Sequence, residues 1–265
     1  MARPEEAELL ALAEDAAAAA ASELRSRFGG GAQGVRSKSS PTDLVSDADV
    51  AAEAAIRSVI SAAYPDDAII GEEGGETGAG ERRWVVDPLD GTINFLFGIP
   101  MFAVSIACED PDGTLAAIVL DPVREERFSA TRSGRAALNG EPIEASQRDE
   151  LASALVATGF AYEASVRARQ AQVVSRVLPR VRDIRRAGAA ALDLCWCACG
   201  RYDAYYERGV HAWDVAAGTL IAQRAGLAVR QLEAAGDDPE GLVAAPPAIV
   251  QELTRLVGGT GRGGA

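Results

Sequence analysis

The segment from Trp84 to Phe95, WVVDPLDGTINF, constrains the fold of this chain more than any other part of its sequence. Its first three residues are apolar and two of them are β-branched valines, which is typical of the end of a buried strand. The proline and the glycine that follow predict a turn, and the next apolar run can open a helix. Asp87 and Asp90 are therefore expected at a strand end and in the adjoining turn, where both can point into one cavity.

Backbone amides in the same segment add a second kind of ligand. If a helix starts at Gly91 and Thr92, their N–H groups can bind an anion. Carboxylates beside such amides suit a hard divalent cation that in turn holds a phosphate. An ordinary Asp-rich turn, which is common in α/β proteins, is the alternative interpretation.

The balance of charged residues narrows the classes of ligand. Of the 265 residues, 39 are acidic and 26 are basic, so the formal net charge is −13. Such a surface argues against a nucleic-acid groove and against an anionic membrane, and an anionic substrate would need bound metal to offset the repulsion. The first residues form no apolar signal core and no apolar run reaches transmembrane length, which predicts a cytoplasmic protein.

Three of the four cysteines are clustered. Cys195, Cys197 and Cys199 fall in or next to an apolar run, Leu192–Ala198, that is predicted to be helical; the fourth is Cys108. On a helix, Cys195 and Cys199 share a face and Cys197 points nearly opposite, so the three cannot close a tetrahedral zinc site unaided. They are expected to be reduced, buried packing residues.

An Ala-rich helix is predicted at the start of the chain. The segment Glu5–Phe28 has strong helix propensity and ends at three glycines. A polar strand or loop over Gln33–Pro41 is expected to follow.

A second helix is predicted to begin at Ser46, which opens a Ser-x-x-acid pattern typical of helix starts. Its apolar periodicity extends to Tyr64. Asp49 and Glu53 are four residues apart and share a face of this helix. Asp49 fits either a simple helix cap or a functional carboxylate.

A pair of glutamates follows the next predicted strand, Ala68–Ile70. Glu72 and Glu73 stand between glycines, which is usual for a solvated turn, and Gly74–Gly80 is expected to be a mobile loop. The turn nevertheless precedes Asp87 by only about a dozen residues. A neighbouring strand could therefore bring Glu72 to the same rim.

Strands and turns alternate up to about residue 145, in the pattern of an antiparallel meander. The predicted strands are Phe102–Cys108, Leu115–Leu120 and Glu126–Ala130. Beyond residue 145, strands at 155–157 and 204–207 alternate with helices at 166–178 and 189–200, as in an α/β half. Asp214 directly precedes a predicted helix, Val215–Ala225, and is expected at its N-cap for stability alone. Residues 259–265 form a Gly-rich tail that is expected to be disordered.

Four carboxylates, Glu72, Asp87, Asp90 and Asp214, are thus predicted at a strand end, a turn or a helix start, which are positions that can face a shared crevice. Three motifs contain them, Gly71-Glu72-Glu73, Asp87-Pro88-Leu89-Asp90-Gly91-Thr92-Ile93-Asn94-Phe95 and Trp213-Asp214-Val215-Ala216-Ala217-Gly218. With these motifs the chain resembles the inositol monophosphatase family of magnesium-dependent, lithium-sensitive sugar-phosphate phosphatases. Other segments that resemble the family are Lys38–Val45 with the following Asp49, Gly188–Leu192 and Asp203–Glu207.

The resemblance covers essentially Glu5–Val257 and implies a mixed α/β fold. It implies a layered αβαβα sandwich with an antiparallel N-terminal sheet and a smaller C-terminal α/β half. Residues 1–258 would form one catalytic domain, with an N-terminal half of about 1–145 and a C-terminal half of about 146–258. A homodimer is implied by the family alone.

The resemblance also implies a set of metal ligands. Glu72, Asp87 and the backbone carbonyl of Leu89 would hold a first Mg²⁺. Asp87, Asp90 and Asp214 would hold a second, and Glu72 would serve a weaker third ion. Ligation by oxygen alone suits Mg²⁺.

The implied catalytic groups surround the same ions. Amides of Asp90, Gly91 and Thr92 would cradle the phosphate. Asp49 would hydrogen-bond Thr92, and this pair, with Glu72 at the metal, would orient and activate a water that attacks without a phosphoenzyme. The substrate hydroxyls would meet Asp90, Gly188, Ala189, Ala190, Glu207 and Asp214.

Departures from the family pattern are small. Leu89 stands where isoleucine is common, and Leu227 stands where many members have a second glycine after Gly226; neither change removes a ligand. His211 is the only histidine, which excludes a histidine triad. It is near the predicted site in sequence and could either line it or have a structural role.

The leading hypothesis is an inositol-1-monophosphatase, a phosphate monoester hydrolase for a small phosphorylated polyol or amino alcohol. The same chemistry could serve histidinol phosphate, fructose bisphosphate or a phosphorylated nucleotide. Glu207 could accept hydrogen bonds from a neutral polyol or pair with the ammonium of histidinol phosphate. The alternative from another class is a catalytically silent regulator that binds metal or phosphate. The sequence does not decide the substrate, the number of ions or the lithium sensitivity.

Overall fold

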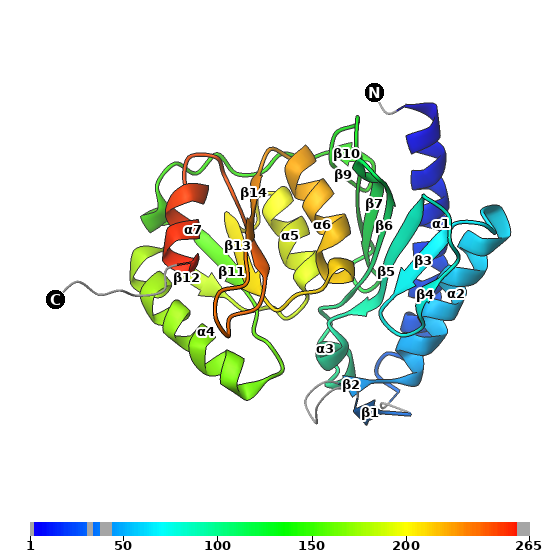
Figure 1. Ribbon diagram of the computed structural model, residues 1–265, viewed down its shortest axis with the longest axis horizontal. Coiled ribbons are helices and arrows are strands. Elements are labelled where there is room, and N and C mark those ends of the chain that lie inside the picture. Colours follow the sequence, from blue (N-terminus) through cyan, green and yellow to red (C-terminus); the bar gives the residue numbers. More distant parts are fainter. Residues whose placement is uncertain (1–2, 31–33, 38–43, 259–265) are drawn as a thin grey trace.

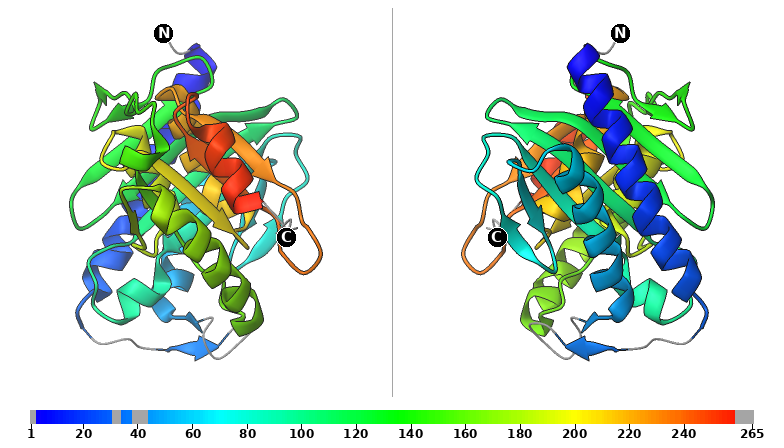
Figure 2. Two further views of the ribbon diagram at one scale, coloured as in Figure 1. Left: turned by 90° about the vertical axis from the view of Figure 1, so that its left-hand side faces the viewer. Right: turned by 90° about the vertical axis from the view of Figure 1, so that its right-hand side faces the viewer.

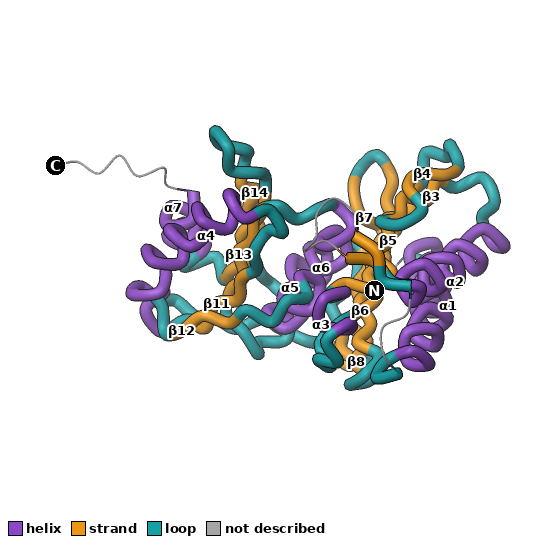
Figure 3. The backbone as a smooth tube through the Cα atoms, turned by 90° about the horizontal axis from the view of Figure 1, so that it is seen from below, coloured by secondary structure: helices purple, strands orange, loops and turns teal. Residues whose placement is uncertain are grey.

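The computed structural model describes residues 3–30, 34–37 and 44–258. Within these ranges, helices and sheets alternate in five layers (Figures 1 and 3). One outer layer is α1 (Pro4–Arg27) with α2 (Asp47–Ala63), the central layer is α5 (Ala190–Ala198) with α6 (Ala212–Arg224), and the other outer layer is α4 (Ala164–Val177) with α7 (Val250–Gly258). The predicted αβαβα sandwich is therefore confirmed. The predicted Lys38 segment up to Asp43 and the predicted tail 259–265 lie outside the described residues.

The Ala-rich helix packs tightly because its side chains are small. The prediction of a helix over Glu5–Phe28 is confirmed by α1, which begins at Pro4 and has two acidic residues in its first turn, as the helix dipole favours. Ala13, Ala16, Ala17 and Ala20 are fully buried. They lie under the large sheet next to α2, and the two helices run side by side across its outer face (Figure 2).

The start of α2 is fixed by the capping pattern read from the sequence. The Ser46 hydroxyl accepts the Ala48 N–H at 3.2 Å, and the Asp49 carboxylate accepts the Ser46 N–H at 2.8 Å. Each bond satisfies an N–H that the helix itself leaves without a partner. The helix ends at Ala63, one residue before the predicted end.

Eight of the described strands form the larger sheet, in the order β10-β9-β8-β7-β6-β5-β3-β4. The strands are β3 (Ala68–Gly71), β4 (Gly75–Thr77), β5 (Arg83–Asp90), β6 (Ala103–Asp110), β7 (Gly113–Asp121), β8 (Glu126–Thr131), β9 (Ala137–Leu138) and β10 (Glu141–Pro142). All neighbours are antiparallel, as predicted, except that β3 and β5 are parallel. The prediction of a mobile loop over Gly74–Gly80 is wrong for Gly75–Thr77, because those residues pair with β3 as β4.

The turn predicted directly after Asp87 is also wrong. Strand β5 continues to Asp90, and its register against β6 shifts between Asp87 and Asp90. Pro88 lies in this bulge, where the strand does not need its missing N–H. Gly91 then adopts a left-handed φ of 94°, which reverses the chain into the short helix α3 (Thr92–Leu96). The two aspartates are therefore at the end of a strand.

Five strands form the smaller sheet among the described residues, in the order β12-β11-β13-β15-β14. They are β11 (Leu155–Thr158), β12 (Asp183–Arg185), β13 (Ala204–Arg208), β14 (Ala228–Leu232) and β15 (Gly241–Ala245). Strands β12, β11 and β13 are parallel to one another, and β15 is antiparallel to β13 and β14. Short elements β1 (Arg36–Ser37), β2 (Leu44–Val45), η1 (Leu151–Ser153) and η2 (Leu178–Arg180) complete the described chain.

The central helices cover the inner faces of both sheets with apolar side chains. Cys195 and Cys197 of α5 are fully buried, Cys199 is partly buried, and all four cysteines are free thiols, as predicted. Burial raises the pKa of Cys195 and of Cys197 well above the ordinary value, so both remain protonated packing residues. Across the described ranges, every helix is too short or too polar to cross a membrane.

Candidate active site

The parallel pair of strands brings Glu72 beside Asp87. Gly71 at the end of β3 is opposite Val86 of β5, so the next residue of each strand emerges at the same edge of the sheet. The Glu72 N–H donates to the Val86 carbonyl at 3.3 Å, which extends the ladder to the turn. The rim position predicted for Glu72 follows from this pairing.

A cleft of about 380 Å³ opens at this edge. Its lining combines the ends of β3 and β5, the start of α3, the approach to α5, the end of β13 and the start of α6. Six of the lining residues are acidic, Glu72, Asp87, Asp90, Glu163, Glu207 and Asp214, whereas the basic ones are Arg186 and His211. The cleft thus gathers negative charge in a place that is partly shielded from water.

Asp87 lies deepest among these carboxylates. It is 2% exposed, and its Oδ1 accepts the Leu89 N–H at 3.0 Å. Burial raises its pKa well above the ordinary value, and the neighbouring charges of Glu72, Asp90 and Asp214 raise it further. The Asp87 side chain therefore resists ionisation unless positive charge enters the cleft.

Asp90 connects the two halves of the molecule. Its two carboxylate oxygens accept the N–H groups of Ala190 at 3.0 Å and Ala191 at 2.8 Å, which are the first amides of α5. Burial raises the pKa of Asp90 well above the ordinary value, and Asp214 adds to the rise. The hydrogen bonds from the Ala190 and Ala191 amides lower the pKa of Asp90, since they favour its charged form.

Asp214 is not the N-cap that the sequence predicted. Helix α6 begins at Ala212, so Asp214 occupies the third position and reaches back to accept the His211 N–H at 2.6 Å. Ser105 of β6 donates to the Trp213 carbonyl at 3.1 Å and fixes this helix start against the large sheet. The His211 ring stacks on Trp213 with ring centres 4.8 Å apart, and both residues line the cleft.

Glu207 forms part of the opposite wall. It is the fourth residue of β13, and its Oε2 accepts the Tyr205 hydroxyl at 2.8 Å. Burial raises the pKa of Glu207 to about 7, and Asp214 contributes to the rise. This carboxyl is therefore partly protonated near neutral pH in the protein alone.

Asp49 and Thr92 are in contact behind the cleft surface. Thr92 Oγ1 lies 3.0 Å from Asp49 Oδ1 and 3.0 Å from the Leu89 carbonyl oxygen. Asp49 is fully buried, and its second oxygen accepts both the N–H and the hydroxyl of Ser46. The cap role and the contact with Thr92 therefore coexist in one carboxylate.

The donor set fits a hard divalent cation. Mg²⁺ prefers oxygen ligands, and several carboxylates lie close together here beside backbone carbonyl groups. Asp87, Asp90 and Asp214 each accept hydrogen bonds from backbone amides, and each carboxylate keeps further lone pairs for a cation. Within the described residues, no group of three or more His, Cys, Asp or Glu side chains is already arranged to hold a metal ion.

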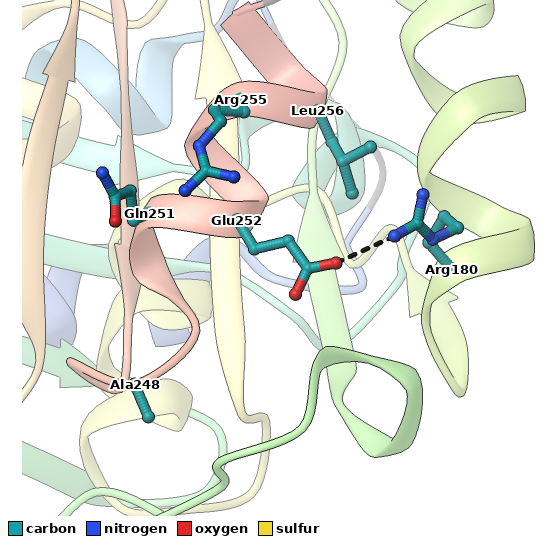
Figure 4. A pocket seen from close by; sticks show the side chains of 6 residues that line it. All are labelled: Arg180, Ala248, Gln251, Glu252, Arg255 and Leu256. Carbon is teal, nitrogen blue, oxygen red and sulfur yellow. Dashed lines mark hydrogen bonds and ion pairs between the residues drawn. The ribbon is translucent and has the colours of Figure 1, made fainter.

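A second hollow is a weaker candidate. A groove of about 460 Å³ lies between α7 and η2, lined by Arg180, Ala248, Gln251, Glu252, Arg255 and Leu256 (Figure 4). Its one acidic side chain, Glu252, already pairs with Arg180 at 3.0 Å. The groove therefore lacks the unbalanced carboxylates that distinguish the acidic cleft.

Most of the residues predicted for the site line the cleft, with two exceptions. Asp49 lies behind Thr92, and Ala189 is buried beside Gly91, whereas its neighbours Gly188 and Ala190 line the wall. Arg186 and the loop 159–163 also line the cleft, and neither was predicted from the sequence. Arg186 stands two residues before the predicted Gly188, but nothing in its local pattern distinguishes it from other surface arginines.

Comparison with known proteins agrees with this arrangement. The sequence profile of the inositol monophosphatase family matches residues 5–257. This chain belongs to the inositol monophosphatase family. The predicted resemblance is therefore confirmed. Membership of this family and the names of its relatives support the assignment of the chain as a phosphatase.

Relatives in the family carry two kinds of name. Inositol-1-monophosphatase SuhB of Mycobacterium tuberculosis is 43% identical over 275 residues, covering 96% of this chain and 95% of that protein. Nus factor SuhB of Pseudomonas aeruginosa is 48% identical over 195 residues, covering 69% and 70%.

Solved structures of family members share the fold. The SuhB structure from Bartonella henselae matches with a TM-score of 0.87 at 34% identity, over 97% of this chain and all of that one. The structure of Mycobacterium tuberculosis SuhB matches with a TM-score of 0.82 at 39% identity, over 96% of this chain and 97% of that one. The predicted fold class is confirmed by these matches.

Proposed function

We propose that this chain is a magnesium-dependent phosphate monoester hydrolase that acts on inositol 1-phosphate. One observation carries the proposal: six acidic side chains from both halves of the chain line a single cleft, and two of them, Asp87 and Asp90, are buried there. Such an arrangement is unfavourable for the protein alone and favourable once divalent cations bind. A negatively charged phosphate ester can then enter a cleft that would otherwise repel it.

The proposed cation ligands are those that the family resemblance implies, and their position along one cleft supports the proposal. Glu72, Asp87 and the Leu89 carbonyl would hold one Mg²⁺, Asp87 with Asp90 and Asp214 a second, and Glu72 a weaker third. When bound, Mg²⁺ lowers the pKa of the attacking water, neutralises the phosphate and stabilises the leaving alkoxide.

Asp49 and Thr92 would orient the attacking water. Thr92 donates its proton to Asp49, so a lone pair of the Thr92 oxygen is left to accept a hydrogen bond from water. As the water oxygen attacks phosphorus, this pair would take a proton from the water and the phosphorus–oxygen bond to the alcohol would break. The leaving alkoxide would take a proton from solvent water, and the pair would later return its own proton to solvent. The amides of Gly91 and Thr92 would hold the phosphate oxygens.

The far wall would bind the alcohol. Glu207, Asp90 and Asp214 supply acceptors for hydroxyl groups, and the backbone at Gly188–Ala190 supplies polar groups beside them. The same acceptors suit the ammonium of histidinol phosphate, and fructose bisphosphate and phosphorylated nucleotides are further alternatives. We also propose a single catalytic domain over residues 1–258 and, from the family, a cytoplasmic homodimer with lithium sensitivity.

A second candidate is a binding role, suggested by the relatives that are called Nus factor SuhB. A protein with that role alone would not need acidic residues from both halves of the chain along one cleft. The acidic lining of this cleft therefore favours catalysis, with or without an added binding role.

Phosphate release tests the proposal. We expect activity on inositol 1-phosphate that requires Mg²⁺, disappears with a chelator and is lost in Asp90→Asn, whereas Asp112→Asn in the exposed β6–β7 turn should match the natural protein. Relative kcat/KM on histidinol phosphate, fructose 1,6-bisphosphate and a 3′-phosphorylated nucleotide ranks the substrates. A higher value for one of these would replace inositol 1-phosphate, and equal activity of Asp90→Asn would refute the assignment of the site.

A further inference from the structure

We infer that Glu53 and Arg57 form a positioning pair that holds the turn carrying Glu72 and thereby sets the affinity of the cleft for divalent cations. This inference rests on the proposed function, because it takes Glu72 as a cation ligand. Both residues lie on α2, outside the cleft lining, and neither belongs to the set of ligands described above.

Glu53 binds the backbone immediately after Glu72. Its carboxylate is buried, with the residue 3% exposed. Oε2 accepts the Glu73 N–H at 2.8 Å, and Oε1 accepts the Gly74 N–H at 2.8 Å. Two charge-assisted bonds to consecutive amides fix both the position and the direction of the turn.

The turn approaches Glu53 so closely that a side chain at Gly71 or Gly74 would have to displace the Glu53 carboxylate. A Cβ added at Gly71 would lie 2.5 Å from the Glu53 carboxylate, and one added at Gly74 would lie 2.6 Å from it. Both distances are below any normal contact. The glycines of the Gly-Glu-Glu-Gly segment therefore have a steric role as well as a turn role: they let the backbone reach a buried carboxylate.

Arg57 completes the pair and neutralises the buried charge. Its Nε donates to Glu53 Oε1 at 2.7 Å. The other guanidinium nitrogens donate to the Gly75 carbonyl at 2.6 Å and to the Thr77 hydroxyl at 2.8 Å, so one planar group joins α2 to β4. A buried carboxylate without such a partner would be strongly destabilising.

The turn that carries Glu72 is held from two sides. The ladder of β3 supports the turn on one side, through the Glu72 N–H and the Val86 carbonyl. Glu53 and Arg57 support it on the other side and keep the ligand in place before the cation arrives.

One face of α2 thus organises two parts of the site. Asp49 holds Thr92, and Glu53, one turn later on the same face, holds the backbone around Glu72. This explains why a helix outside the cleft carries two buried acidic residues on its inner face.

Glu53→Gln is the informative variant. Its amide nitrogen replaces one of the two acceptor oxygens, so in either orientation a donor faces one of the two turn amides, and in one orientation it also faces Arg57. Outer groups that orient metal ligands typically contribute about 10- to 100-fold to metal affinity. We therefore expect Mg²⁺ binding, measured by calorimetry on the folded full chain, to weaken by about that factor. In metal-free protein, hydrogen exchange at Glu73 and Gly74 should become faster.

The matched control is Glu23→Gln on α1. Glu23 pairs with Arg27 at the same i, i+4 spacing, but both side chains are 40% exposed and remote from the turn. This control should leave Mg²⁺ affinity and exchange at Glu73 unchanged. Arg57→Gln, which keeps Glu53 but loses the bonds to β4, serves as a second variant if Glu53→Gln does not fold, and it should also weaken Mg²⁺ binding.

The outcomes separate the two proposals. Failure of the natural protein to bind Mg²⁺ would defeat the proposed function. Hydrogen exchange at Glu73 and Gly74 in metal-free protein would still test whether Glu53 and Arg57 hold the turn. If the natural protein binds Mg²⁺ and the Glu53 and Arg57 variants bind it as tightly as the Glu23 control does, the positioning role is wrong.

Discussion

Acidic side chains in this molecule occupy two contrasting settings. On the outer surface, arginines lie beside them and lower their pKa: Arg132 acts on Asp110, Arg201 on Glu126 and Arg185 on Asp183, in each case chiefly through a side-chain hydrogen bond. In the cleft, burial and other carboxylates raise the pKa of Asp87, Asp90 and Glu207.

The contrast shows which carboxylates stabilise the fold and which do not. An acid with a lowered pKa stabilises the folded protein at neutral pH, whereas an acid with a raised pKa destabilises it. The net charge of −13 alone does not reveal this division. Acids paired with arginines over the whole surface would not form a site for a cation, whereas the local excess of acids in the cleft makes it a candidate cation site.

Asp87→Asn should break the contrast most strongly. Loss of a carboxylate that we propose holds two ions should reduce Mg²⁺-dependent phosphate release by at least about 100-fold, more than the loss of a group that only orients a ligand. In metal-free buffer at pH 8 the same variant should unfold at a higher temperature than the natural protein, because one repelling charge is gone. Activity assays and thermal unfolding check the two halves of this prediction; retained activity would contradict it.

Glu207→Gln should show the pH dependence of a raised pKa. The folded protein holds the Glu207 proton up to about pH 7, whereas the ordinary value is 4.5. The folded state therefore binds more protons between these values, and the natural protein loses stability relative to the variant as pH rises through this window, by up to about 3 kcal/mol. Urea unfolding of metal-free protein at pH 5 and pH 8 measures it. A difference between the two proteins that does not change with pH would be evidence against this account.

Glu126→Gln should give the smallest effect and the opposite sign. Arg201 lowers the pKa of Glu126, so the carboxylate contributes stability above the ordinary value of 4.5 and loses it as pH falls through the lowered folded pKa. Because Arg201 is 37% exposed, the loss at pH 7 should be below about 1 kcal/mol. Phosphate release should be unchanged. The same unfolding series measures the first effect, and a larger loss at acidic than at neutral pH would be inconsistent with it.

Local patterns predicted the elements that depend on local physics. The Ser46 cap, the Ala-rich first helix and the layered fold were predictable because capping, periodicity and family motifs act over short segments. Asp214 was misplaced because the residues before it extend the helix toward its N-terminus, which the pattern starting at Val215 does not show. The β5 bulge was missed because a proline usually ends a strand, whereas here β5 pairs with β6 on both sides of Pro88.

Features that depend on distant contacts could not be predicted. Arg186 and the loop 159–163 reach the cleft only through the packing of the two halves. Glu53 was noticed for sharing a face with Asp49, but its bonds to the amides of Glu73 and Gly74 depend on where β3 ends. Sequence reasoning thus identified residue types suited to a metal site, and the fold determined which of them meet.

Calorimetric titration of Mg²⁺ into metal-free full-length protein at pH 7, in two buffers of different ionisation enthalpy, tests the central claim most directly. Ligand carboxylates must lose any proton they hold to bind a cation, and the raised pKa values of Asp87 and Asp90 increase the share of each that is protonated before binding. We predict saturable binding with proton release, both absent in Asp87→Asn. No saturable binding, or binding that Asp87→Asn leaves intact, would contradict the account.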